Sequence, residues 1–234
     1  MQTIILAAGL GTRLRPLTYK KPKPLIEING KPFLWYLLKN LNSAGHRSLI
    51  IIAHYKIEQI KTFVDKYEKE NDCEIKVIDQ GEVLGTGHAL QSAKDLAEKN
   101  FIVVMSDNLY SCIDLKNIAK EDDFCYVGAI KNETPERYGN LVFENEYLKE
   151  IVEKPKIAIS SYINTGLYKF TYEIFNALSK IKPSQRGEYE LTDAISILCK
   201  ERKVKIVKLK DYWLDLGCLE DIKKIENALK SKFF

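Results

Sequence analysis

The chain has 234 residues, of which 45% are hydrophobic and 29% are charged, and its formal net charge is +4 at pH 7. This composition is ordinary for a soluble globular protein and excludes a disordered chain. No apolar run approaches the ~20 residues that span a bilayer, and the first residues lack the basic flank of a signal peptide. We therefore expect a cytoplasmic protein with no membrane partner, and its mild charge does not indicate nucleic-acid binding.

The first half of the chain alternates short buried strands with amphipathic helices. Strands are predicted at 3–7, 49–53, 74–78 and 101–105. Helices are predicted from Pro32 to Gly45, around 57–64 and over 89–98. Buried strands that alternate with helices predict a parallel, doubly wound sheet with right-handed crossovers.

After about Leu115 the rhythm changes to strands with few helices between them. Strands are predicted at 124–130, 138–143, 148–152, 162–170 and 204–209, with a hairpin turn at Glu146. Helices are predicted at 172–178, 191–200 and 219–230. We interpret this half as antiparallel strands that extend the sheet or cap its edge, and the absence of repeats or linkers predicts one domain over 1–234.

Five cysteines, none in a Cys-x-x-Cys pair, indicate neither a disulfide framework nor a zinc site. We expect most of them to be small buried hydrophobic residues. They are Cys73, Cys112, Cys125, Cys199 and Cys218.

A glycine loop with a local excess of positive charge follows the first strand. Gly9 and Gly11 let the backbone approach a ligand, free N–H groups suit phosphate oxygens, and Arg13 adds a planar charged fork. A solvated basic loop is the alternative. A dinucleotide fingerprint is disfavoured, because Leu14 occupies the third glycine position and Pro16 follows. A P-loop is disfavoured because no Gly-Lys-Ser/Thr ends the loop.

The strings Gly-Leu-Gly-Thr-Arg at 9–13, Pro-Leu-Thr at 16–18 and Lys-Pro-Lys-Pro at 21–24 resemble the signature of sugar-1-phosphate nucleotidylyltransferases. These enzymes join a nucleoside triphosphate to a sugar 1-phosphate and release pyrophosphate. The resemblance covers essentially the whole chain. It implies a Rossmann-like three-layer α/β/α sandwich with a mostly parallel mixed sheet and added antiparallel strands. It also implies a nucleotide-binding half at 1–110 and a sugar-phosphate-binding half at 111–234.

The implied reaction is an in-line attack of a sugar-phosphate oxygen on the α-phosphorus. A phosphate monoester has its second pKa near ~6, so no general base is required at pH 7. The site must instead supply cations and a metal ion to stabilise charge. By resemblance, Arg13 holds the β- and γ-phosphates, Lys23 meets the α-phosphate, and Asp107 and Lys154 complete the catalytic set.

The resemblance implies that Asp107 and Asp215 bind Mg²⁺, because hard carboxylates and phosphate oxygens suit that ion. Asp107 follows the fourth predicted strand, at the carboxyl edge of the sheet where ligands bind. Asp215 lies in Trp-Leu-Asp-Leu-Gly at 213–217. Without the family, either aspartate is equally well explained as a turn former. Ser106 and Cys218 depart from the residues common in relatives.

The loop at 80–90 is the base-reading segment by resemblance, with Gln80 and the Gly85 backbone pairing with uracil or thymine. An amide side chain both donates and accepts, which matches a carbonyl and an N–H on one edge. His88 is interpreted as a residue of the first helical turn rather than a catalyst. The full predicted nucleotide-binding set is Leu6, Ala8, Gly9, Gly11, Thr12, Arg13, Lys23, Gln80, Gly85, Thr86 and Asp107.

The sugar side, also by resemblance, has Glu153 accepting from sugar hydroxyls and Lys154 binding the sugar's phosphate. Its full predicted set is Gly139, Glu153, Lys154, Asn164 and Asp215. Glucose 1-phosphate with UTP or dTTP is favoured. N-acetylglucosamine, muramic acid or heptose 1-phosphates, and CTP or GTP, stay open. The segment from Glu190 to Asp193 either borders the sugar pocket or only starts a helix.

The predicted protein is thus a Mg²⁺-dependent enzyme whose partners are a nucleoside triphosphate and a sugar 1-phosphate, and a homo-oligomer stays open. The repeated acyltransferase domain of some relatives is not seen, so we expect the transfer step alone. The alternative from another class is a non-catalytic nucleotide-sugar sensor. The presence of Arg13, Lys23, Asp107, Lys154 and Asp215 argues against it.

Overall fold

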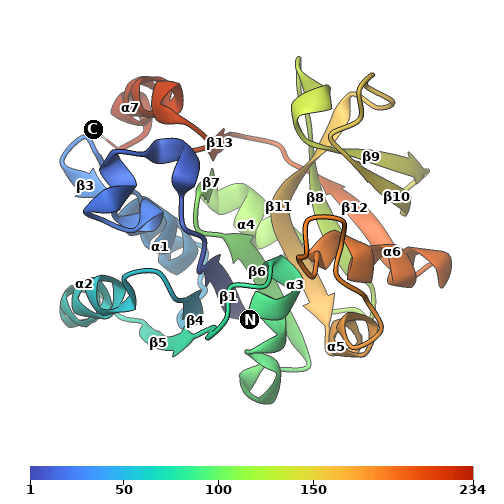
Figure 1. Cartoon of the computed structure of the whole chain (residues 1–234), viewed down its shortest axis with the longest axis horizontal. Helices are drawn as coiled ribbons and strands as arrows, with labels where there is room; N and C mark the ends of the chain where they lie inside the picture. The colour runs from blue at the N-terminus through green and yellow to red at the C-terminus, as the bar shows by residue number, and fades with distance from the viewer. Residues whose placement is uncertain (234) are drawn as a thin grey trace.

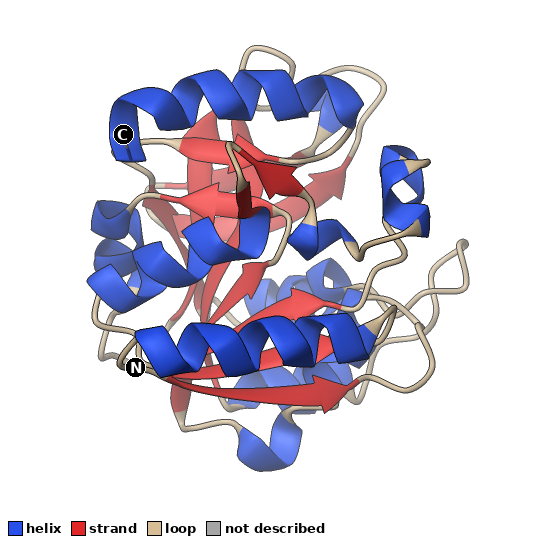
Figure 2. Ribbon diagram, turned by 90° about the vertical axis from the view of Figure 1, so that its left-hand side faces the viewer, coloured by secondary structure: helices blue, strands red, loops and turns tan. Residues whose placement is uncertain are grey.

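The computed structural model describes residues 1–233, with side chains described as far as Lys230. Within these residues a nine-stranded sheet forms the middle layer and helices cover both of its faces (Figures 1 and 2). The expected three-layer α/β/α sandwich is confirmed. In spatial order the strands are β5 (Glu74–Asp79), β4 (Ser48–Ala53), β1 (Gln2–Ala7), β6 (Asn100–Met105), β11 (Tyr162–Thr171), β8 (Cys125–Lys131), β12 (Val204–Lys208), β10 (Tyr147–Glu153) and β9 (Gly139–Glu144).

The first four of these strands are parallel, as the alternation of strands and helices predicts. β1 lies between β4 and β6, with Ile4 opposite Ile50 on one side and Val103 on the other. Every residue of β1 is buried, because helices cover both faces of this part of the sheet.

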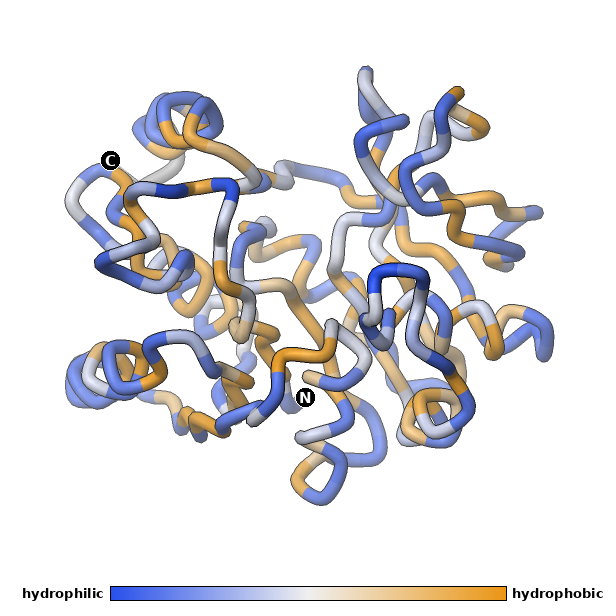
Figure 3. The backbone as a smooth tube through the Cα atoms, in the orientation of Figure 1, coloured by the Kyte–Doolittle hydropathy of each residue, from blue (hydrophilic) through white to orange (hydrophobic). Residues whose placement is uncertain are grey.

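Side chains of β1 alternate between two hydrophobic cores. Ile5 and Ala7 pack in the core beneath α1 (Phe33–Ser43), α2 (Ile57–Glu70), α4 (Cys112–Ile118) and α7 (Leu219–Phe233). Ile4 and Leu6 pack in the core beneath α3 (Thr86–Gln91), α5 (Glu173–Leu178) and α6 (Leu191–Lys200). Each fully buried aliphatic side chain contributes roughly 1.5–3 kcal/mol. Figure 3 shows hydrophobic residues along the central strands and hydrophilic residues in the outer loops.

The second half adds the expected antiparallel strands. β11 runs antiparallel beside β6, with Leu167 opposite Val104. β9 and β10 form a hairpin whose turn contains Asn145 in the left-handed region (φ 56°) beside Glu146, as predicted. β9 also pairs with β11 at Asn140 and Ile163, so this end of the sheet curls back on itself.

Both ends of the helix predicted over 89–98 are wrong. α3 begins at Thr86 and ends at Gln91, and a separate 3-10 helix, η4, covers Lys94–Leu96. The Ser92 hydroxyl donates to the Ala89 carbonyl at 2.7 Å, and such local hydrogen bonds compete with helix continuation. The pattern also missed α4, the pairing of β7 (Asn108–Tyr110) with β13 (Trp213–Asp215), and the β2 (Glu27–Ile28) and β3 (Lys31–Pro32) pair.

The prediction that most cysteines are buried is also wrong. Cys125 and Cys199 are buried, whereas Cys73, Cys112 and Cys218 are partly exposed, and all five are free. The last three lie near ends or turns of elements, and of these Cys73 still packs against the edge of the core beneath α1 and α2. No helix of the described chain is long and apolar enough to span a bilayer. The assignment of 1–234 to one domain stays a prediction, and Phe234 lies outside the described residues.

Candidate active site

A cavity of about 570 Å³ lies at the carboxyl ends of β1 and β6. It is bordered by the glycine loop after β1, by the segment after β5 and by the start of α3. All eleven residues predicted to bind the nucleotide line it, although they come from four separate segments of the chain. These residues are Leu6, Ala8, Gly9, Gly11, Thr12, Arg13, Lys23, Gln80, Gly85, Thr86 and Asp107.

A neighbouring cavity of about 240 Å³ is lined by all five residues predicted for the sugar phosphate. These are Gly139, Glu153, Lys154, Asn164 and Asp215, from the strands β9, β10, β11 and β13 and their ends. The two cavities, called here the nucleotide cavity and the sugar cavity, meet along a shared wall. Five residues line both: Arg13, Thr86, Met105, Asp107 and Arg186.

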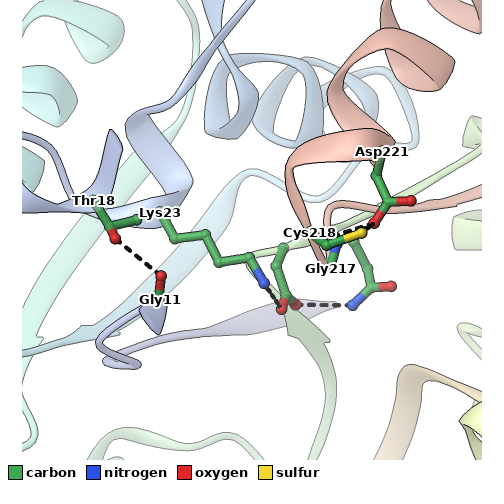
Figure 4. A network of polar contacts seen from close by, with 8 residues as sticks. Gly11, Thr18, Lys23, Gly217, Cys218 and Asp221 are labelled. Carbon is green, nitrogen blue, oxygen red and sulfur yellow. Dashed lines mark hydrogen bonds and ion pairs between the residues drawn. The ribbon is translucent and has the colours of Figure 1, made fainter. Parts of the chain in front are cut away.

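The glycine loop is held in one shape by contacts within it. Gly11 has φ +62°, and a Cβ there would lie 2.9 Å from the Thr18 side chain and 3.1 Å from Lys23 Cβ. The Thr18 hydroxyl donates to the Gly11 carbonyl at 3.0 Å (Figure 4), and the Tyr55 hydroxyl donates to the Thr18 carbonyl at 2.8 Å. Only glycine fits at position 11, and the loop places Lys23 beside it.

Lys23 and Asp107 form the central ion pair of the site. Lys23 begins the 3-10 helix η3 (Lys23–Leu25), and its Nζ lies 2.5 Å from Asp107 Oδ2 (Figure 4). Asn108 donates from Nδ2 to Asp107 Oδ1 at 2.9 Å, so both carboxylate oxygens are engaged. Lys23 is only 9% exposed, and a buried ammonium requires such a partner.

Most of the positive charge between Arg13 and Lys31 is directed away from the cavities. Lys21 pairs with Glu27, Arg15 stacks over Tyr19 at 5.2 Å, and Lys31 lies over Trp35 at 5.4 Å. Of the six basic residues in this segment, Arg13 and Lys23 line the cavities. The charge run thus contributes two cations to the site rather than a broad basic patch.

Asp215 is brought beside Asp107 by a two-stranded ladder that the sequence pattern missed. β13 pairs with β7, so that Asp215 lies opposite Asn108, and the Leu216 amide donates to the Asp107 carbonyl at 2.9 Å. Burial, and then repulsion from Asp107, raises the pKa of Asp215 to about 6, whereas Lys23 and Arg13 act in the opposite direction.

These two carboxylates fit a divalent cation. Repulsion from Asp107 adds to the effect of burial in raising the pKa of Asp215, and a cation between the two carboxylates would remove that repulsion. Among the described residues, no group of three or more His, Cys, Asp and Glu side chains is placed to hold a metal ion. Mg²⁺ commonly binds through one or two carboxylates, waters and substrate phosphates, so two aspartates suffice.

The turn after Asp215 is fixed by Asp221, at the start of α7. Its Oδ2 accepts from the amides of Gly217 at 3.0 Å and Cys218 at 2.8 Å, and the Cys218 thiol donates to it at 3.1 Å (Figure 4). Gly217 lines the nucleotide cavity, and a Cβ there would lie 3.2 Å from Asp215 Oδ2. The departure at Cys218 therefore preserves a hydrogen-bonded turn.

Glu153 and Lys154 lie where β10 ends, at the mouth of the sugar cavity. Glu153 pairs with Gly139 across the hairpin, and a Cβ on Gly139 would lie 3.0 Å from Glu153 Oε1. Burial raises the pKa of Glu153. Lys154 has φ 42°, a left-handed conformation that a non-glycine side chain rarely adopts, and its amide donates to the Tyr138 carbonyl at 3.2 Å.

Asn164 lines the sugar cavity from a bulge in β11. Its Oδ1 accepts from the Gly166 amide at 3.1 Å, and its Nδ2 donates to the Tyr168 hydroxyl at 2.8 Å. The side chain therefore holds the bulge together as well as facing the cavity. Gly166 has φ +73°, and a Cβ there would lie 2.6 Å from Met105 Cγ.

The base-reading segment is joined to a loop from the second half of the chain. The Gly87 amide donates to the Tyr189 carbonyl at 2.7 Å, and the Tyr189 amide donates to the Leu84 carbonyl at 2.7 Å. The Thr86 hydroxyl accepts from the Leu191 amide at 3.0 Å. Gly85 has φ +104°, and a Cβ there would lie 2.7 Å from the Tyr189 carbonyl oxygen. These hydrogen bonds join the wall of the nucleotide cavity to that of the sugar cavity.

Sequence reasoning missed several residues that line the cavities, above all Arg186 and Arg137. Arg186 lines both cavities and lies 2.6 Å, Nη2 to Oε1, from Glu190. No sequence signal distinguishes these two arginines among the 36 lysine and arginine residues of the chain. Glu190 precedes α6 and also lines the sugar cavity, so both open interpretations of that segment hold.

Each cavity is lined by residues from both halves of the chain. Arg186, Glu188 and Gly217 reach the nucleotide cavity, and Arg13 and Thr86 reach the sugar cavity. The assignment of 1–110 to nucleotide and 111–234 to sugar phosphate stays a prediction. His88 is the third residue of α3, in its first turn.

The nucleotidyl transferase family model matches residues 2–232, and the chain belongs to this family. It is 41% identical to the bifunctional protein GlmU of Methanocaldococcus jannaschii over 233 residues, which cover 99% of this chain and 55% of that protein. It is 34% identical to the UTP–glucose-1-phosphate uridylyltransferase AglF of Haloferax volcanii, covering 99% of this chain and 98% of that one. The chain spans about half the length of the GlmU proteins it matches.

A solved structure of UDP-glucose pyrophosphorylase in complex with UDP-glucose superposes with a TM-score of 0.85 at 25% identity. The match covers 99% of this chain and 98% of that one. The family and the Rossmann-like fold that the glycine loop implied are therefore confirmed.

Proposed function

We propose that this chain transfers a nucleotidyl group from UTP or dTTP to a hexose 1-phosphate, with release of pyrophosphate and formation of a nucleotide sugar. One observation carries the proposal. The residues predicted for the two substrates line two cavities that meet at Arg13 and Asp107. Two phosphorylated molecules in these cavities would face one another at that shared wall.

The side chains at the shared wall suit a reaction between two anions. Arg13 forms no ion pair with any described residue, so its guanidinium is available to phosphate oxygens. Lys23 is presented to the same cavity by the glycine loop, and Lys154 faces the sugar cavity from the other side. Holding the reacting atoms in line and neutralising their charge lowers the barrier without a nucleophilic side chain.

Asp107 and Asp215 are the residues that would hold Mg²⁺ in this proposal. The ion would supply positive charge to the phosphate oxygens. Lys23, which pairs with Asp107 in this structure and lines the nucleotide cavity, would meet the α-phosphate. Asn108 would keep the Asp107 carboxylate in place through its bond to Oδ1.

Glucose 1-phosphate and UTP are the substrates that the relatives favour. AglF is named for them, and the superposed pyrophosphorylase binds UDP-glucose. On the sugar side, the partly desolvated Glu153 carboxylate would accept from ring hydroxyls, with Lys154 on the phosphate. The free state of all five cysteines supports a cytoplasmic location.

The test is a substrate panel with pyrophosphate detection. UTP, dTTP, CTP and GTP would each be combined with glucose, N-acetylglucosamine and heptose 1-phosphates, with Mg²⁺ or with excess chelator. We expect turnover with UTP or dTTP and glucose 1-phosphate that the chelator abolishes. Binding of nucleotide sugars without turnover of any pair would instead establish a sensor.

A further inference from the structure

The amide of Gln80, in the nucleotide cavity, is held by two groups of its own chain. Gln80 follows β5 and is 6% exposed, and its backbone amide donates to the Ala53 carbonyl at 2.8 Å. Its side-chain Nε2 lies 3.3 Å from the Gly85 carbonyl oxygen and 3.1 Å from His88 Nδ1. The sequence alone suggests an amide that both donates to and accepts from a base, but these contacts leave fewer of its hydrogen-bonding groups free for a ligand.

The neighbours of the amide determine which way it points. A carbonyl oxygen only accepts, so the contact with Gly85 requires the nitrogen of the amide, and not its oxygen, on that side. The second N–H then donates to His88, whose Nδ1 must be unprotonated, with the ring proton on Nε2. Both N–H groups are therefore used within the protein.

What remains for a ligand is one acceptor and one donor. Gln80 lines the cavity, and no donor among the described residues bonds its Oε1. The Gly85 amide N–H likewise has no hydrogen-bond acceptor within residues 1–233. A base that fits this pair must offer an N–H to Gln80 and a carbonyl to Gly85.

We infer that His88 is a positioning residue that fixes the Gln80 amide, so that the nucleotide cavity takes a base with an N–H beside a carbonyl, such as the N3–H edge of uracil or thymine, and rejects cytosine. Cytosine has an acceptor at N3, which would face the Gln80 oxygen with no hydrogen between them. The inference rests on the proposed nucleotidyl transfer and explains how that site selects its nucleotide. His88 acts through Gln80 and does not line the cavity itself.

Two substitutions at His88 separate positioning from packing. His88→Leu replaces the ring by an apolar side chain of similar bulk and removes the acceptor. Only the Gly85 carbonyl then orients the Gln80 amide, which turns more readily to present its nitrogen to cytosine. His88→Asn keeps an acceptor, Oδ1, near the position of Nδ1. The readout is the ratio of kcat/KM for UTP to that for CTP, with glucose 1-phosphate as second substrate.

We expect His88→Leu to lower this ratio about tenfold or more, mainly through a higher KM for UTP, since one oriented hydrogen bond is lost. We expect His88→Asn to stay within about threefold of the wild type. An unchanged ratio in His88→Leu, or an equal loss in His88→Asn, would overturn the inference. A wild type that uses UTP and CTP equally would overturn it as well.

Two further measurements keep the inference testable if catalysis or the variants fail. Absence of turnover with every triphosphate would refute the proposed function, and calorimetric Kd values for UTP and CTP would still report the base preference. Nitrogen-15 NMR of the wild type reads the His88 tautomer directly. We expect the proton on Nε2, and a proton on Nδ1 in the neutral ring would refute the positioning role.

Discussion

The nucleotide side and the sugar side of the site are built in different ways. On the nucleotide side, continuous strings of sequence form loops at the ends of parallel strands, and Lys23, Asp107 and Asn108 already satisfy one another. On the sugar side, single residues come from separate antiparallel strands. Lys154 is held in a left-handed conformation, and Glu153 is partly desolvated. One side is preformed by loops of the glycine string and its neighbours, and the other is assembled from strands that the tertiary fold brings together.

The largest expected effect comes from the carboxylate at the wall between the two sides. Asp107→Ala should lower kcat by about a thousandfold or more, because it removes a proposed metal ligand and the partner of Lys23. Steady-state pyrophosphate release measures this loss, and circular dichroism controls for folding. A variant that keeps wild-type rates would show that the two sides do not react at this wall.

Variants of Lys23 and Lys154 test whether the nucleotide side and the sugar side bind their substrates independently. Lys23→Ala and Lys154→Ala should each lower kcat/KM about a hundredfold, since each removes one cation from the reacting phosphates. Lys154→Ala should leave the calorimetric Kd for UTP unchanged. Lys21→Ala and Lys156→Ala are the matched controls, because both side chains are exposed and line neither cavity. Weakened UTP binding in Lys154→Ala would erase the distinction between the sides.

The contacts that join the base-reading segment to Tyr189 should be sensitive to a substitution of Gly85. Gly85→Ala places a Cβ 2.7 Å from the Tyr189 carbonyl oxygen, at φ +104°. We expect about a tenfold loss of kcat/KM and a loss of about 2–3 kcal/mol in the free energy of unfolding, from clash and strain together. Gly81→Ala, at φ +72° with no atom within 4 Å, isolates the strain and should cost about 1 kcal/mol. Equal losses in the free energy of unfolding for Gly85→Ala and Gly81→Ala, measured by urea titration, would argue against a tight contact with Tyr189.

A further effect concerns stability without metal rather than activity. The pKa of Asp215 is raised from 3.8 to about 6, so the folded state binds this proton more tightly than the unfolded state does. The associated stability is complete below about pH 4 and is lost as the pH rises through 6. In EDTA at pH 7, Asp215→Asn should therefore raise the free energy of unfolding by up to about 3 kcal/mol.

Urea unfolding at pH 4 and pH 7 measures this difference, which should disappear at the lower pH. Asp95→Asn, at an exposed position, is the control and should change little at either pH. A destabilised Asp215→Asn variant at pH 7 would mean that the wild-type carboxylate is not strained by its neighbour.

The sequence predicts the parallel half of the fold well, because strands buried on both faces are continuous apolar runs, as at 49–53. It also assigns many of the residues that line the nucleotide cavity, since Gly11, Arg13 and Lys23 lie in one recognisable string. It does not predict the β7–β13 ladder, whose three-residue strands pair across more than a hundred residues. Arg186 is missed because no local pattern distinguishes it, and its loop meets the nucleotide cavity through the backbone bonds of Tyr189 with Leu84 and Gly87.

In the proposed reaction, two bound substrates react directly at the shared wall, without a nucleophilic side chain. The most direct measurement is exchange of labelled pyrophosphate into UTP by the purified, Mg²⁺-loaded protein, with and without glucose 1-phosphate. We expect no exchange in the absence of the sugar phosphate and rapid exchange once it is added. Exchange without the sugar phosphate would reveal a covalent nucleotidyl-protein intermediate and would contradict a direct reaction between the two substrates.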